Sequence, residues 1–163
     1  MIRVIVDDLA QVAVDAVVRP ADEALGPATE ATARLDQRAG PRFADQRRTA
    51  TPLEAGAAVV TAGGDLAAPF VLHAVIRDHR VEVGREVVRR ALVSAWQRAG
   101  DWGLATIASP LVGAGALSLE EAASLLAETF PRSGGPEAPS ELHIVVDLET
   151  ERAMVEAIVR RTT

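Results

Sequence analysis

The residues best suited to chemistry form a turn of small side chains, Gly113-Ala-Gly-Ala116. An apolar run over 104–108 precedes this turn and predicts a buried strand. Ser118 follows it and precedes a helix over 119–126 whose first turn is acidic. Such a turn can hold a phosphate, because its backbone N–H groups and the dipole of the following helix both favour an anion. The alternative is a tight strand-to-helix connection that binds nothing.

Composition narrows the class of protein. The chain has 163 residues, no Cys and three scattered His, so we expect no disulfide, no thiol nucleophile, no metal site and no cofactor. The net charge of −6 disfavours nucleic acid as a partner, since that binding depends on neutralising phosphates. No stretch has the character of a signal peptide or a membrane span. We therefore expect a single cytoplasmic domain over 1–163 that does not contact membranes.

Hydrophobic periodicity predicts strands that alternate with helices. Apolar runs and alternating residues predict strands over 2–6, 15–19 (ended by Pro20), 56–61, 70–76, 104–108 and 142–146. Helical spacing and caps predict helices over 30–38 (between Thr29 as N-cap and Gly40), 83–99, 119–126 and 149–161. Residues 131–141, rich in Pro and Gly, are expected to form a flexible surface loop. This alternation predicts an α/β fold, a three-layer α/β/α sandwich with a mixed, mostly parallel sheet.

The exits of three predicted strands carry the candidate polar residues. These exits are Asp7-Asp8, the segment 19–22 and the segment 110–116. Ligands of open α/β sheets bind outside the carboxyl ends of the strands. We therefore expect the three exits to rim one crevice.

Five segments, in order and at matching spacing, resemble the macro domain family, whose members bind ADP-ribose. The segments are Asp8-Leu9, Asp15-Ala-Val-Val-Arg-Pro-Ala-Asp22, Gly56-Ala-Ala-Val-Val-Thr61, Phe70-Val-Leu-His-Ala-Val75 and Ile107-Ala-Ser-Pro-Leu-Val-Gly-Ala-Gly115. They stand where the family has Gly-Asp-Ile, Asp-Ala-Ile-Val-Asn-Ala-Ala-Asn, Gly-x-Ala-x-x-Thr, Tyr-Val-Ile-His-Ala-Val and Ile-Ala-Phe-Pro-Ala-x-x-x-Gly. The resemblance spans nearly the whole chain and implies the macro domain fold.

The resemblance implies roles for two carboxylates. Asp8 matches the aspartate that accepts a hydrogen bond from the adenine amino group, and the Leu9 N–H could support that contact; alternatively, Asp8 only serves the turn after the strand. Asp22 replaces the asparagine that holds the distal ribose. It can still accept hydrogen bonds from hydroxyl groups but has no amide donor. The alternative for Asp22 is an exposed loop acid.

The resemblance also implies a phosphate loop and an adenine contact. The better preserved phosphate loop comprises Val112, Gly113, Ala114, Gly115, Ala116 and Leu117. Leu117 replaces an aromatic residue that covers the ribose in many members. Val146 stands where the family stacks an aromatic residue on adenine.

The other phosphate loop departs from the family pattern. Its glycines are replaced by Ala28, Thr29 and Glu30, and the catalytic aspartate of the hydrolase members is replaced by Thr32. A threonine hydroxyl cannot act as a carboxylate base at neutral pH, so we assign no catalytic residue. Arg19 could compensate by reaching a phosphate; the alternatives are a solvent-facing arginine or one paired with an aspartate.

Three functions follow from the resemblance. The first, which we favour, is binding of ADP-ribose or a related nucleotide without efficient catalysis. The second is an enzyme that hydrolyses ADP-ribose adducts or processes ADP-ribose 1″-phosphate, with altered catalytic residues. The third is a macro-like scaffold that binds no nucleotide. His73 matches a mid-strand position and is expected to be a core histidine, and the oligomeric state is left open.

Overall fold

A computed structural model describes residues 1–132 and 135–163 and contains one mixed sheet of six strands. The strand order is β1-β6-β5-β2-β4-β3, and every neighbouring pair is parallel except β3 and β4. The strands are β1 (Ile2–Val6), β2 (Ala16–Ala21), β3 (Ala58–Ala62), β4 (Phe70–Val75), β5 (Thr106–Ser109) and β6 (Glu141–Val146).

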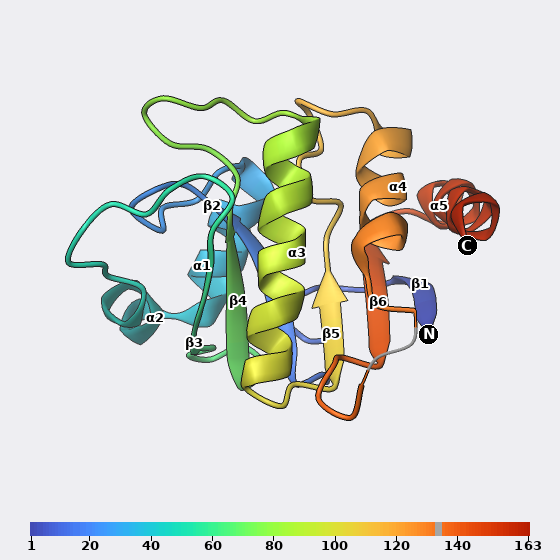
Figure 1. Cartoon of the computed structure of the whole chain (residues 1–163). Helices are drawn as coiled ribbons and strands as arrows, with labels where there is room; N and C mark the ends of the chain where they lie inside the picture. The colour runs from blue at the N-terminus through green and yellow to red at the C-terminus, as the bar shows by residue number, and fades with distance from the viewer. Residues whose placement is uncertain (133–134) are drawn as a thin grey trace.

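Helices cover both faces of this sheet (Figure 1). They are α1 (Glu30–Ala39), α2 (Pro41–Gln46), α3 (Arg85–Asp101), α4 (Leu119–Thr129) and α5 (Glu149–Thr162). Helices α3 and α4 lie in front of the sheet in this view, α1 and α2 lie behind it, and α5 packs beside α4 at the β1 end. The predicted three-layer α/β/α sandwich with a mixed, mostly parallel sheet is confirmed.

Alternation along the strands builds a separate apolar cluster on each face of the sheet. Leu72 belongs to the cluster that includes Trp96 of α3, whereas its neighbour Val71 belongs to the cluster that includes Phe43 of α2. Successive strand side chains point to opposite faces, so a continuous apolar run is the pattern required of a strand covered on both sides.

The predicted N-cap of α1 is confirmed, and α4 begins directly after Ser118, where its helix was predicted to begin. The Thr29 hydroxyl accepts the Thr32 N–H at the start of α1, and Gly40, with φ of 85°, ends that helix. Ser118 and Glu121 form a reciprocal capping box at the start of α4. These caps fix where each helix begins, and both helices begin next to the carboxyl edge of the sheet.

Pro20 does not end its strand as predicted. It lies inside β2, opposite Ala74 of β4. Pairing of β2 with β5 is confined to Ala16 and Val17, so the missing N–H of Pro20 interrupts no ladder on that side. The strand therefore continues as far as Ala21.

The flexible loop predicted over 131–141 is described only in part. Residues 133 and 134 of the predicted flexible loop over 131–141 lie outside the described residues, and Glu141 already belongs to β6.

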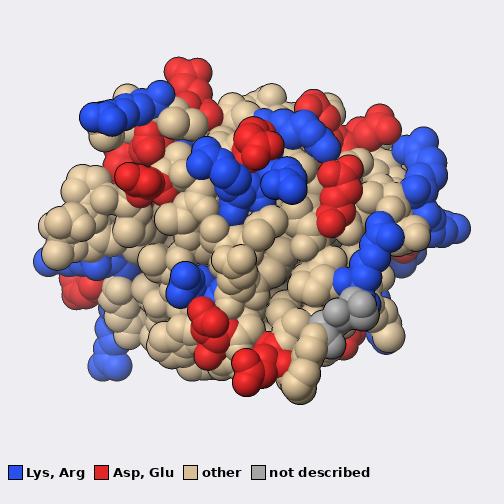
Figure 2. Space-filling model, in the orientation of Figure 1, with Lys and Arg blue, Asp and Glu red and all other residues tan. Residues whose placement is uncertain are grey.

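No helix among the described residues is long and apolar enough to cross a membrane. On the face drawn in Figure 2, acidic and basic side chains are interspersed rather than gathered by sign.

Candidate ligand-binding cleft

A cleft of about 650 Å³ opens at the carboxyl ends of the strands, beside α1. This volume lies in the range usual for small-molecule sites. The lining comes from five parts of the chain: Asp7, Asp8 and Leu9 after β1; Pro20 of β2; Thr29, Ala31, Thr32, Arg34, Leu35 and Arg38 of α1 and its cap; Pro110, Leu111, Gly113 and Ala114 after β5; and Val145, Val146, Asp147 and Glu151 around the exit of β6.

Half of the ligand-binding residues that were predicted from the sequence line the cleft. Asp8, Leu9, Gly113, Ala114 and Val146 line it. The other five predicted residues, Asp22, Val112, Gly115, Ala116 and Leu117, are outside the lining. The prediction that the strand exits rim one crevice is therefore confirmed for the segments after β1 and β5. It is also confirmed for the end of β2, where Pro20 lines the cleft.

On the β1 side of the cleft, the Asp8 carboxylate has two partners. One oxygen accepts the Ala10 N–H at 3.0 Å, which shapes the turn after β1. The other oxygen lies 2.7 Å from the Arg38 guanidinium. Both interpretations of Asp8, a contact with adenine and a role in the turn after β1, are thus compatible with its position, because it shapes the turn and also lines the cleft.

The loop after β5, which also lines the cleft, is held by its own backbone hydrogen bonds and by packing of its side chains. The Leu117 N–H donates to the Gly113 carbonyl at 2.8 Å, and the Ala114 N–H donates to the Leu111 carbonyl at 3.2 Å. Val112 is fully buried and Leu117 is nearly so, and both belong to the core cluster under α3. Their side chains anchor the loop, which leaves Gly113 and Ala114 to face the cleft.

Glycine is required at position 113 for two reasons. Its φ is 88°, a conformation that residues with a side chain rarely adopt. A Cβ there would also lie 2.9 Å from the Leu117 side chain and 3.1 Å from that of Val88. Gly115 has a similar φ of 100°, but a Cβ at that position would meet open space.

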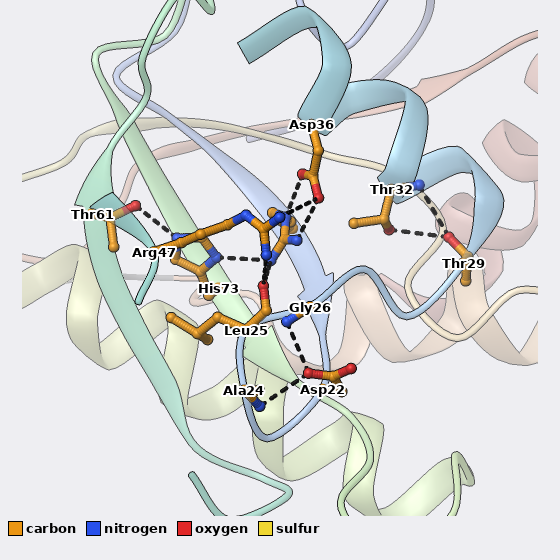
Figure 3. Close-up of polar contacts among 11 residues, drawn as sticks. Asp22, Ala24, Leu25, Gly26, Thr29, Thr32, Asp36, Arg47, Thr61 and His73 are labelled. Atoms are coloured by element: carbon orange, nitrogen blue, oxygen red, sulfur yellow. Dashed lines mark hydrogen bonds and ion pairs between the residues drawn. The ribbon is translucent and has the colours of Figure 1, made fainter. Parts of the chain in front are cut away.

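Asp22 serves its own loop instead of the cleft. Its carboxylate accepts the N–H groups of Ala24 at 3.0 Å and Gly26 at 2.8 Å (Figure 3). These bonds close the turn that contains Leu25, whose φ is 58°. Asp22 is half-buried, not the exposed loop acid of the alternative interpretation, and its predicted contact with a ribose has no support from the cleft lining.

Two threonines stand where the family's glycine loop and catalytic aspartate would be. The hydroxyl groups of Thr29 and Thr32 are 3.0 Å apart and hydrogen bonded. Thr32 is buried, and both residues line the cleft. They offer hydroxyl groups to a ligand but no carboxylate that could act as a base.

Arg19 does not reach the cleft. Its guanidinium is fully buried and forms two hydrogen bonds with Asp36, at 2.7 and 2.6 Å. It also donates to the Leu25 carbonyl at 2.8 Å, and Arg47 donates to the same carbonyl at 2.7 Å. The aspartate-paired alternative is therefore confirmed, whereas compensation at the phosphate and exposure to solvent are both wrong.

His73 is a core histidine, as expected. Its ring lies 2.7 Å from the Thr61 hydroxyl on one side and 3.2 Å from the Arg19 guanidinium on the other. Burial, with the nearby Arg19 and Arg47 charges, holds the pKa of His73 well below 6.5. The ring is therefore neutral at physiological pH.

Sequence reasoning missed the wall that α1 contributes. Ala31, Arg34, Leu35 and Arg38 are spaced so that they share one helical face, and all four line the cleft. The spacing was visible in the sequence, but which face of α1 meets the cleft is set by how the helix packs on the sheet.

Among the described residues, no three His, Asp or Glu side chains lie close enough together to hold a metal ion.

Comparison with known proteins supports this architecture. The family model described as Macro domain matches residues 18–126. An uncharacterized protein of Aeropyrum pernix is 30% identical over 142 residues, which cover 81% of this chain and 75% of that protein.

Solved structures of low identity share the fold. A mutant macrodomain of Oceanobacillus iheyensis has a TM-score of 0.81 at 18% identity, covering 97% of this chain and 90% of that one. Another mutant of the same macrodomain, solved with ADPR, has a TM-score of 0.73 at 16% identity, covering 97% and 91%. The Trypanosoma brucei macrodomain, in complex with ADP, has a TM-score of 0.80 at 22% identity, covering 97% and 68%.

Proposed function

The chain belongs to the macro domain family, and from that premise we propose that it binds ADP-ribose, or a nucleotide of the same build, in the cleft beside α1 without efficient catalysis. Two structural neighbours, one solved with ADPR and one with ADP, support a nucleotide as the ligand class.

The observation that carries the proposal is the arrangement of the cleft. Its lining includes Asp8 and Leu9 after β1 and Gly113 and Ala114 after β5, two strands that are separated by β6, with α1 alongside. A carboxylate suits a base with an amino donor, and a small-residue backbone next to a helix N-terminus suits a phosphate. A ligand with a base at one end and phosphates further along matches that order.

Efficient hydrolysis is disfavoured by the residues at the catalytic positions. Thr32 replaces the family aspartate, is buried, and is hydrogen bonded to Thr29. Asp22 replaces the family asparagine, and one oxygen of its carboxylate, Oδ1, accepts two N–H groups of its own loop. Thr32 therefore offers no carboxylate base, and Asp22 lacks the amide donor of the asparagine that it replaces.

Calorimetric titration with ADP-ribose tests the binding proposal, with AMP and ribose 5-phosphate as partial ligands. We expect ADP-ribose to bind more tightly than either part, because only the whole molecule spans the cleft. Absence of heat at millimolar ADP-ribose would overturn the proposal. A hydrolysis assay on ADP-ribosylated protein tests the second clause, and turnover at the rate of an efficient hydrolase would contradict it.

A further inference from the structure

The cleft wall formed by α1 carries two arginines that the proposed function does not yet use. Arg34 and Arg38 are four residues apart, lie on one face of the helix, and both line the cleft. The Arg38 guanidinium pairs with Asp8 at 2.7 Å, with exposed side-chain fractions of 57% and 38%. Within the described ranges, Arg34 forms no ion pair with an acid, including Glu30 one turn before it.

The acidic and the basic residues of the cleft come from different elements. The acidic residues lie at the exits of β1 and β6, namely Asp7, Asp8, Asp147 and Glu151. The two basic residues lie on α1. A ligand that fits such a cleft presents hydrogen-bond donors to the strand exits and an anion to the helix. Guanidinium groups bind phosphate with two parallel hydrogen bonds, which suits that anion.

Arg34 lies part of the way along the cleft wall that α1 forms. Thr29 caps the start of α1, and Arg38, in the last turn of the same helix, contacts Asp8. These two residues are separated by roughly 13 Å along the helix axis at the usual rise per residue. Arg34 lies between them, one turn from Arg38.

We infer that Arg34 and Arg38 determine the specificity of this site by binding a phosphate group of the nucleotide. Arg34 contacts the phosphate directly. Arg38 exchanges Asp8 for the phosphate when the ligand enters, which frees the Asp8 carboxylate for a donor on the base. The pair is exposed enough that solvent screens it, so breaking it opposes binding only weakly. This inference rests on the proposed function and names how the chain replaces the missing glycine loop.

Charge-neutral variants test the inference, with a matched control on the next helix. Arg42 is an exposed arginine of α2 that does not line the cleft, so Arg42→Gln removes the same charge elsewhere. We expect Arg34→Gln to weaken nucleotide binding by about 10- to 100-fold, the usual effect of losing one hydrogen bond to a charged group. We expect Arg38→Gln to weaken it less, because Asp8 is then already free, and Arg42→Gln to bind as the wild type does.

Three probes separate this inference from the proposed function: ADP-ribose, ADP and inorganic pyrophosphate, each titrated into the wild type and the three variants. If ADP or pyrophosphate binds and ADP-ribose does not, the proposed function fails, and the inference stands only if Arg34→Gln loses that binding. If Arg34→Gln binds as Arg42→Gln does, the inference is overturned while the proposed function survives. If none of the three probes binds the wild type, both are overturned. A thermal melt of each variant verifies that it is folded.

Discussion

Asp8 has two partners in the unliganded protein, and a substitution there acts on both. The carboxylate holds the turn after β1 through the Ala10 N–H and meets Arg38 across the cleft. A base with an amino donor would replace Arg38 and leave the turn intact. This separation makes it possible to remove one interaction at a time.

We predict that Asp8→Ala weakens binding of ADP-ribose by about 10- to 100-fold while the fold is kept, since one charged hydrogen bond is lost. Calorimetry measures the affinity, and circular dichroism verifies the fold. Asp8→Asn is the matched variant, because its amide oxygen can still accept the Ala10 N–H at the turn. Unchanged affinity in Asp8→Ala would remove Asp8 from the site.

A second residue-scale prediction concerns Arg19, which holds Asp36 in the core. Arg19→Met leaves the Asp36 carboxylate largely buried without its main partner, so we predict a loss of about 3–5 kcal/mol in the free energy of unfolding. Urea denaturation measures the change. The double variant Arg19→Met/Asp36→Leu removes both charges and should recover much of the loss. A single variant as stable as the wild type would contradict the role given to this pair.

At the scale of elements, the loop after β5 is positioned by buried residues on both sides of its turn. Val112 and Leu117 pack into the core, and this packing presents Gly113 and Ala114 to the cleft. The cap at Ser118 then fixes the start of α4. The loop is therefore part of the core and also part of the cleft lining.

We predict that Gly113→Ala destabilises the protein more than Gly115→Ala does. Both substitutions place a side chain at positive φ, which typically costs about 1–3 kcal/mol. Only Gly113→Ala also forces a Cβ against Leu117 and Val88, which adds about 1–3 kcal/mol of overpacking. Thermal denaturation of the two variants measures the difference, and only Gly113→Ala should also weaken nucleotide binding. Equal losses of stability would show that the packing around Gly113 is loose.

At the scale of the whole molecule, one buried network connects two strands of the sheet with α1, the end of α2 and the loop after β2. Arg19 of β2 and Arg47 after α2 both donate to the Leu25 carbonyl, and Arg19 also binds Asp36 of α1 and lies next to the His73 ring of β4. Figure 3 shows Asp36, Arg47, Leu25 and His73 around these contacts. This network fixes α1 against the sheet. The position of the cleft wall thus depends on residues that never touch the ligand.

The neutral His73 ring predicts how global stability depends on pH. Its pKa is lowered in the folded protein, so below about 6.5 the unfolded chain binds a proton that the folded chain does not. The contribution of His73 to the free energy of unfolding is fully present above that pH. It falls as the pH drops towards 5, by at most about 1.4 kcal/mol per pH unit. Chemical denaturation at pH 7.5, 6 and 5 measures this slope. His73→Gln cannot titrate at this position and should show a shallower slope; equal slopes would assign the dependence to other groups.

The elements themselves could be predicted because their signals are local. The apolar runs of β4 and β6, the Thr29 cap, the Gly40 end and the Ser118 cap all depend on neighbouring residues. The extension of β2 through Pro20 could not be predicted, because it depends on β5 having already separated from that strand.

The sequence alone thus determined the alternating elements, the sheet class and the gathering of strand exits at one edge, because periodicity and parallel strand order dictate them. Only the tertiary structure decided which side chains face the cleft. It turned Asp22 towards its own loop, buried Arg19 against Asp36, and brought Arg34 and Arg38 into the cleft wall. The physical reason is that a side chain's direction depends on the packing of its whole element, and that packing is set by contacts between residues far apart in the chain.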